Sequence, residues 1–129
     1  MLPVKHSVAV MVVRGNEILA IRRPPDDDEL PGVWGLPAGT IRGAETVDEL
    51  IQRIGRDKLG VRLTPFRKVA SGVDDRPRYR LEMDLWEVSM EGTPTYPEWL
   101  WASVDLLRPG MAAGSLCCRL AVQNKSRAR

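Results

Sequence analysis

Residues 39–61 carry four charged side chains whose types and spacing suit chemistry on a phosphate group: Glu45, Arg53, Asp57 and Lys58. Carboxylates are hard oxygen ligands of the kind that Mg²⁺ takes. Arg53 can orient Glu45 or Asp57 through charge-assisted hydrogen bonds, or it can be a solvated helix arginine. Lys58 can meet a phosphate directly as a point charge, or it can be an exposed lysine that complements the dipole of a helix end.

These side chains must be positioned by a helix, which we expect over residues 46–59. Thr46 and Glu49 fit a capping box, in which each side chain satisfies an orphan amide of the first turn. Gly60 is placed to end the helix. Gly55 costs about 1 kcal/mol relative to alanine in a helix interior, and we interpret it as allowing close backbone packing. One face of the helix is apolar: Val47, Leu50, Ile51 and Ile54.

Short apolar runs around this helix predict strands at residues 8–13, 18–21, 33–36, 66–73 and 79–90, followed by an aromatic segment at 96–101. Residues 39–44 are expected to form a loop. A short helix is expected from residue 104, stopped by Pro109 and Gly110, and a final helix over residues 116–122. Strands around a central helix indicate a single mixed α/β domain, residues 1–123, with a basic C-terminal tail at residues 124–129.

The spacing within residues 39–61 resembles the Nudix box. The family pattern is glycine, five residues, glutamate, seven residues, then Arg-Glu-apolar-any-Glu-Glu-any-Gly-apolar. Gly39, Glu45 and Arg53 stand in this register, and Gly60 and Val61 close it. Residues 34–39, Trp-Gly-Leu-Pro-Ala-Gly, resemble the family's usual approach to the box. With the early hairpin and residues 101–103, the resemblance covers nearly the whole chain and implies a Nudix-type α/β/α sandwich with a mixed β-sheet.

The resemblance also implies a chemistry. Nudix enzymes hydrolyse nucleoside diphosphates linked to another moiety, and Mg²⁺ or Mn²⁺ neutralises the charge that develops on the phosphate oxygens. The ligand implied for this chain is a nucleotide or another diphosphate-containing small molecule. Carried over position by position, the implied residues are catalytic Glu45, Arg53 and Asp57, with Asp57 also binding metal. The substrate-binding candidates are Gly39 of the box, Arg23 at a strand end that borders the nucleotide site by resemblance, and Lys58, whose charge can meet a phosphate.

The box departs from the family pattern where metal should bind. Ile54 replaces the first glutamate, Asp57 replaces the next, and Lys58 replaces the last, while Gly55 takes an apolar position. The three metal-facing positions therefore supply one neutral, one negative and one positive side chain instead of three carboxylates. Because Lys58 would repel a divalent cation at contact distance, we expect weak or absent Mg²⁺ binding at the box.

Two functions remain open. The chain can be a Nudix hydrolase that is weak or has an altered metal dependence. Alternatively, it can be a catalytically inactive Nudix-fold module that binds a nucleotide or a protein partner. Fold alone does not decide between them, because function lies in the site. The sequence also leaves the oligomeric state open, a homodimer included.

Other side chains have both a functional and a structural interpretation. Arg22 and Arg23 end a predicted strand, where they can border a nucleotide or form an edge-strand charge pair. The acidic run at residues 26–29 can collect a metal or simply be solvated. Three aromatic side chains can stack on a base or close a small core: Tyr96, Trp99 and Trp101.

Composition excludes several classes of protein. A formal net charge of +2 does not argue for nucleic acid or a membrane as a partner, and no apolar run reaches the length of a membrane span. With one histidine, His6, the chain has no Cys/His zinc set. The adjacent Cys117 and Cys118 are expected to be reduced, with at least one facing the core, which suits a cytoplasmic protein.

Overall fold

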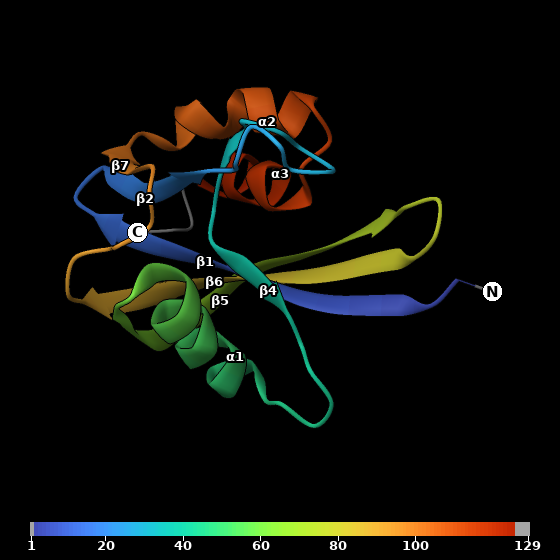
Figure 1. Cartoon of the computed structure of the whole chain (residues 1–129), viewed down its shortest axis with the longest axis horizontal. Coiled ribbons are helices and arrows are strands. Elements are labelled where there is room, and N and C mark those ends of the chain that lie inside the picture. Colours follow the sequence, from blue (N-terminus) through green and yellow to red (C-terminus); the bar gives the residue numbers. More distant parts are fainter. Residues whose placement is uncertain (1, 126–129) are drawn as a thin grey trace.

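The computed structural model describes residues 2–125, in which a seven-stranded sheet lies between two helical layers (Figure 1). The main strand order is β3-β2-β1-β6-β5, with β4 paired to β1 and β7 paired to β2. The strands are β1 (Val4–Arg14), β2 (Glu17–Arg22), β3 (Trp34–Gly35), β4 (Ala38–Thr40), β5 (Arg62–Asp75), β6 (Arg80–Glu91) and β7 (Trp99–Ala102).

The sheet is mixed, as the sequence predicts. β1 and β6 run parallel over a long register, from Val4 opposite Arg80 to Val12 opposite Val88, and the other pairings are antiparallel. Parallel neighbours need a crossover connection that leaves the sheet. The helix of the Nudix-like box, residues 47–59 and hereafter the box helix, lies in the chain between β1 and β6 and covers one face of the sheet (Figure 1). The α/β/α sandwich is therefore confirmed.

The box helix begins as the capping box predicts. In α1 (Val47–Arg53), the Glu49 amide donates to the Thr46 hydroxyl at 3.1 Å, and the Thr46 amide donates to the Glu49 carboxylate at 2.9 Å. The predicted extent of the helix, to residue 59, is confirmed, and its second half is a π-helix, η1 (Ile54–Leu59). The helix ends at Gly60, whose φ of 67° is left-handed and suits glycine.

Gly55 explains how η1 packs. A Cβ at this position would lie 2.8 Å from Leu63 Cγ and 2.9 Å from the Val61 carbonyl oxygen, so only a glycine lets η1 lie this close to the start of β5. The Gly55 carbonyl also accepts backbone hydrogen bonds from Gly60 and Val61, which closes the wider turn. The predicted role of Gly55 in close backbone packing is confirmed.

Two segments differ from the sequence prediction. Residues 38–40 form β4, paired with Ser7–Ala9 of β1, where a turn and loop were expected. Pro109 and Gly110 do not stop a helix. After η2 (Val104–Leu107) they lie in α2 (Arg108–Ala112), whose first turn tolerates proline because no intrahelical amide bond is lost there. Gly110 is required because a Cβ would lie 2.6 Å from Cys118 Sγ.

Apolar side chains form two cores, one on each face of the sheet, because alternate residues of β1 point to opposite sides. Val8, Val10 and Val12 pack with the box helix. Ala9 and Met11 pack with the other layer, which includes α3 (Leu116–Gln123). The expected apolar face of the box helix is confirmed, since Leu50, Ile51 and Ile54 are buried in the first core and Val47 packs against it.

The sheet ends at β5, whose outer edge has no strand partner among residues 2–125. Its pairing with β6 is irregular between Pro65 and Arg67 and again between Lys68 and Ala70. Phe66, between these two points, has 68% of its surface exposed. The β5–β6 hairpin extends beyond the helical layers (Figure 1).

The C-terminal residues that the structure describes are attached to the domain. The Asn124 side chain donates to the Leu120 carbonyl at 2.8 Å, and Lys125 lies 3.7 Å from Asp105. The predicted basic tail starts at residue 124, but residues 126–129 lie outside the described part of the chain. Among the described residues, no helix combines the length and apolar character needed to cross a membrane.

Candidate functional site: a cationic cleft beside the box helix

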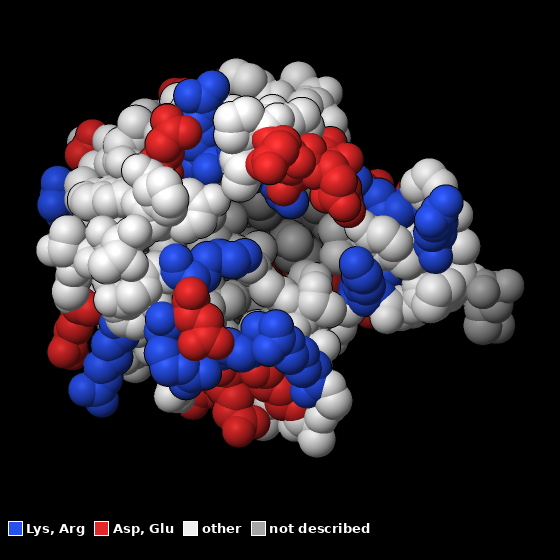
Figure 2. Space-filling view, viewed as in Figure 1, with Lys and Arg blue, Asp and Glu red and all other residues white. Residues whose placement is uncertain are grey.

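A cleft of about 440 Å³ opens between the box helix, β4 and the loop of residues 24–33. Figure 2 shows a hollow on this face, with acidic side chains over that loop on one rim and basic side chains over the box helix on the other. The charged residues that line the cleft are four cations and two carboxylates: Lys5, Arg23, Lys58, Arg76, Asp27 and Glu29. The lining is therefore net positive.

Lys58 is the cation from the box that enters this cleft. Its Nζ donates to the Ala38 carbonyl at 2.6 Å, across from the helix to β4. Lys58 is exposed at the surface of the molecule, but partial desolvation of its ammonium group at the cleft lowers its pKa, and the nearby Arg23 and Arg53 lower it further. Within residues 2–125 no carboxylate forms an ion pair with Lys58. A positive group in this setting is stabilised by an anion that enters the cleft.

Arg23 also lies in the cleft and is held by the acidic loop. Its Nε donates to Asp27 at 3.2 Å, and the same carboxylate oxygen accepts the amides of Leu30 at 2.8 Å and Glu29 at 3.2 Å. These bonds lower the pKa of Asp27, the Leu30 amide most of all. Asp27 thus fixes the loop and orients Arg23.

The opposite wall of the cleft comes from residues that sequence reasoning missed. Lys5 lies 4.4 Å above the Tyr79 ring, a cation–π contact. The Tyr79 hydroxyl donates to Glu29 at 3.3 Å, and Arg76 lies 4.0 Å from the same carboxylate. These contacts tie the acidic loop to the β5–β6 hairpin. No local motif marks Lys5, Arg76 or Tyr79, because they meet only through the parallel pairing of β1 with β6.

Glu45 and Arg53 form an ion pair of their own outside this cleft. Arg53 donates to both oxygens of Glu45, at 2.8 and 3.0 Å, and to the Thr40 carbonyl at 2.8 Å. About 15% of each side chain is exposed. The Arg53 hydrogen bond, with an Arg42 amide, lowers the pKa of Glu45 to about 2. Of the two partners predicted for Arg53, Glu45 is therefore the one it orients, and the pair fastens the box loop to β4.

Asp57 lies apart from the cleft. Its side chain is 56% exposed and pairs with the neighbouring Arg56 at 2.9 Å. A π-helical turn is wider than an α-helical one, so residues after Arg53 rotate differently from what an α-helical box spacing implies. In this helix Lys58, and not Asp57, lines the cleft.

The residues present do not fit a Mg²⁺ ion at the box. The structure brings together no group of three or more His, Cys, Asp or Glu side chains suited to a metal within residues 2–125. Glu45 is held by Arg53, Asp57 is held by Arg56, and Lys58 contacts the Ala38 carbonyl. Ile54, at the position of the first glutamate, is 3% exposed in the core. A divalent ion here would meet an ammonium where the family pattern has a carboxylate.

Gly39 has a structural reason to be glycine. A Cβ at Gly39 would lie 3.0 Å from Leu50 Cδ1 and 3.2 Å from Ile54 Cγ1, so β4 passes close under the box helix. Gly39, a predicted substrate-binding residue, also lines the cleft. The structure therefore brings Arg23, Gly39 and Lys58 to one cleft and leaves Glu45, Arg53 and Asp57 outside it.

Of the remaining candidate residues, only the aromatic Tyr96 lines the cleft. Its hydroxyl donates to the Arg22 carbonyl at 3.1 Å. Trp99 and Trp101 lie on β7 and pack against the core, with Arg14 stacked 4.3 Å from the Trp101 ring. Arg22 is exposed and contacts Gly32 and Glu98, outside the cleft lining.

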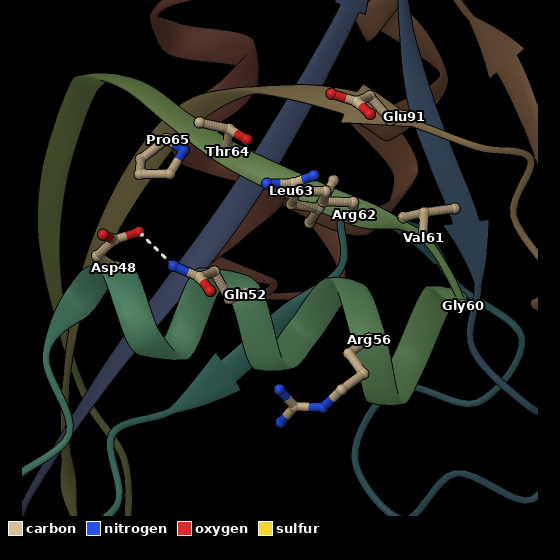
Figure 3. Close-up of a pocket in the computed structure, with 10 residues that line it drawn as sticks. All are labelled: Asp48, Gln52, Arg56, Gly60, Val61, Arg62, Leu63, Thr64, Pro65 and Glu91. Atoms are coloured by element: carbon tan, nitrogen blue, oxygen red, sulfur yellow. Dashed lines mark hydrogen bonds between the residues drawn. The ribbon is translucent and has the colours of Figure 1, made fainter.

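A second groove, of about 730 Å³, lies on another side of the box helix, against the start of β5 (Figure 3). Gln52 donates to Asp48 across one helical turn here, at 3.2 Å. Its charged lining has two acids and two bases, so it has no preference for an anion: Asp48, Glu91, Arg56 and Arg62. The cationic cleft is the better candidate for a phosphate ligand.

Both cysteines are free and buried, as predicted. Cys117 lines the cleft, while Cys118 lies behind it, against α2. The sequence predicted that at least one thiol faces the core, but it did not predict that Cys117 lines the cleft. That position depends on how α3 packs against β3, which is a contact between segments distant in the sequence.

Comparison with known proteins agrees with this architecture. A Nudix hydrolase from Nitrosomonas europaea superposes with a TM-score of 0.77 at 13% identity, covering 96% of this chain and 88% of that one. The MutT protein from Methanosarcina mazei superposes with a TM-score of 0.75 at 17% identity, covering 99% and 97%. This chain therefore has the same fold as these Nudix and MutT proteins.

Sequence comparison points in the same direction. The chain is 30% identical over 118 residues to a protein from Pseudomonas aeruginosa named NAD-capped RNA hydrolase NudC, a match covering 88% of this chain and 41% of the relative. The chain spans between 22% and 41% of the lengths of the curated relatives that it matches. No family model matches the chain.

Proposed function

We propose that this chain binds a diphosphate-containing nucleotide in the cationic cleft and does not hydrolyse it by the Mg²⁺-dependent route of the superfamily. The observation that carries this proposal is the Lys58 ammonium, 2.6 Å from the Ala38 carbonyl, at the box position of a metal-binding glutamate. A lysine here offers a phosphate the positive charge that a divalent ion otherwise supplies.

The charge balance of the cleft supports an anionic ligand. Asp27 and Glu29, its two carboxylates, are already engaged by Arg23 and by Tyr79 and Arg76. An incoming phosphate therefore competes with the Ala38 carbonyl for Lys58, and not with a carboxylate. Hydrogen bonds to a charged group contribute about 1.5–3 kcal/mol, so losing Lys58 should weaken binding about 10- to 100-fold.

The name of the Pseudomonas aeruginosa relative suggests the first ligand to test. That protein is named an NAD-capped RNA hydrolase, and NAD holds two nucleotides through a diphosphate. The two tyrosines in the cleft lining, Tyr79 and Tyr96, offer rings beside the cations for a base or nicotinamide group. NAD and ADP therefore test the same phosphate contacts with and without the second nucleotide.

The test is calorimetric titration of NAD and ADP, each with EDTA and with added Mg²⁺. We expect binding that persists in EDTA, falls about 10- to 100-fold in Lys58→Met, and is unchanged in Lys68→Met, a matched exposed lysine on β5 outside the cleft. The rival function, a hydrolase with altered metal dependence, predicts Mg²⁺- or Mn²⁺-dependent release of mononucleotides that Asp57→Ala abolishes. That result would overturn the proposal.

A further inference from the structure

The two adjacent cysteines lie side by side at the first turn of α3. The position that a Cβ would take at Gly35 lies 3.8 Å from Cys118 Sγ and 3.9 Å from Cys117 Sγ. Both sulfur atoms therefore face the same small space, which residue 35 leaves open because it has no side chain. Cys117 also lines the cleft, so this space has a route to solvent.

The surroundings distinguish the two thiols. The Ser115 hydroxyl lies 3.3 Å from Cys117 Sγ and caps the helix by accepting the Cys118 amide. Contact with the Cys118 thiol, with the Ser115 hydroxyl and with the Leu36 amide lowers the pKa of Cys117. Contact with Cys117, together with burial, raises the pKa of Cys118. Cys117, which lines the cleft, is therefore the thiol that a solute in the cleft meets first, and Cys118 is a second thiol beside it.

A disulfide is not the natural product of this pair. Bonding two adjacent cysteines directly closes a small ring that strains the preferred disulfide geometry. One atom inserted between the sulfurs enlarges the ring and relieves that strain. Thiolates are soft ligands and prefer soft centres. Within the described residues no third His, Cys, Asp or Glu joins the pair, so the centre must be satisfied by two protein ligands.

We propose that Cys117 and Cys118 form a dithiol site that captures a soft metal or metalloid centre entering through the cationic cleft. A trivalent arsenical is the matching probe, because it can exchange one oxygen for two sulfurs. With phenylarsine oxide, two S–H bonds and the arsenic–oxygen bond break, and two arsenic–sulfur bonds form. The oxygen leaves as water with both protons, and nothing is oxidised or reduced. The site does not depend on what the cleft binds otherwise.

The experiment measures the intact mass of the native protein after one equivalent of phenylarsine oxide. We expect one adduct per chain, which survives an excess of the monothiol 2-mercaptoethanol and is removed by the dithiol dithiothreitol. Cys117→Ala and Cys118→Ala should each lose the monothiol-resistant adduct. An adduct that either variant retains, or that 2-mercaptoethanol removes from the native protein, would overturn the proposal.

A second measurement uses the unaltered chain, because Cys118 is tightly packed and its removal can affect folding. The treated native protein is denatured in urea, alkylated with iodoacetamide and mapped by peptide mass. Protection of both cysteines supports the dithiol site, whereas alkylation of either one refutes it. Absence of any adduct on the native protein, under conditions where the urea-unfolded chain forms one, also refutes it. Neither readout involves NAD or ADP, so failure here is distinct from failure of the proposed function.

Discussion

Replacing Gly55 by alanine tests whether the π-helical half of the box helix depends on close packing against β5. The new Cβ would lie 2.8 Å from Leu63 Cγ and 2.9 Å from the Val61 carbonyl oxygen. Leu63 is 2% exposed and Val61 contributes backbone, so neither can move cheaply. Overpacking of this kind costs about 1–3 kcal/mol, and we expect the upper end. Alanine returns about 1 kcal/mol through helix propensity, which leaves a net loss of about 2 kcal/mol.

Thermal unfolding followed by circular dichroism measures this loss. For a domain of intermediate size, about 2 kcal/mol corresponds to a fall in Tm of roughly 6–10 °C. Arg56→Ala is the matched control, since Arg56 is exposed on the same helix and should change stability by less than about 0.5 kcal/mol. If Gly55→Ala is as stable as the wild type, or more stable, then helix propensity outweighs packing and the account of η1 is wrong.

Three further predictions concern the box. The Glu45–Arg53 pair stabilises the fold fully above about pH 4.5, and this stabilisation is lost as the pH falls towards the folded-state pKa of Glu45, about 2. The difference in urea midpoint between the wild type and Glu45→Gln should therefore shrink as the pH is lowered over that interval. A difference that stays constant would contradict this prediction. Thr46→Ala should lower the free energy of unfolding by about 1 kcal/mol in urea titrations, and no change would show that the capping box contributes nothing. Lys58→Glu should create Mg²⁺ binding that calorimetry detects and that Lys58→Met lacks. The reason is that one unit charge at roughly 4 Å from the ion contributes a gross energy of about 4 kcal/mol at an effective dielectric of about 20. Equal Mg²⁺ binding by the wild type would refute this prediction.

The parts of the fold that local sequence rules govern were predictable. The capping box at Thr46 and Glu49, the apolar face of the box helix and the helix end at Gly60 all follow from contacts within a few residues. The strands with apolar runs were also found. Their ends were less well placed, because long pairing between β1 and β6 continues each strand past its apolar run.

The features that were not predictable arise from contacts between distant segments. Residues 38–40 form a strand because they pair with β1. Position 110 of α2 needs a glycine because Cys118 leaves no room for a Cβ there. For the site, the motif register marked Lys58 as a departure from the family pattern, and the structure places it in the cleft lining. It could not show that Lys58 lines the cleft while Asp57 lies outside it, since both residues keep their places in the sequence pattern.

The irregular outer edge of β5 has a consequence for self-association. A long, flat strand edge with an exposed phenylalanine is a template for cross-β aggregation. Around Phe66, however, Pro65 has no amide to donate, and the two irregularities in pairing with β6 disturb the regular spacing that a stacking strand would need. The exposed Lys68 adds a charge that repels an identical strand. The edge can therefore carry an apolar side chain in water without seeding fibrils.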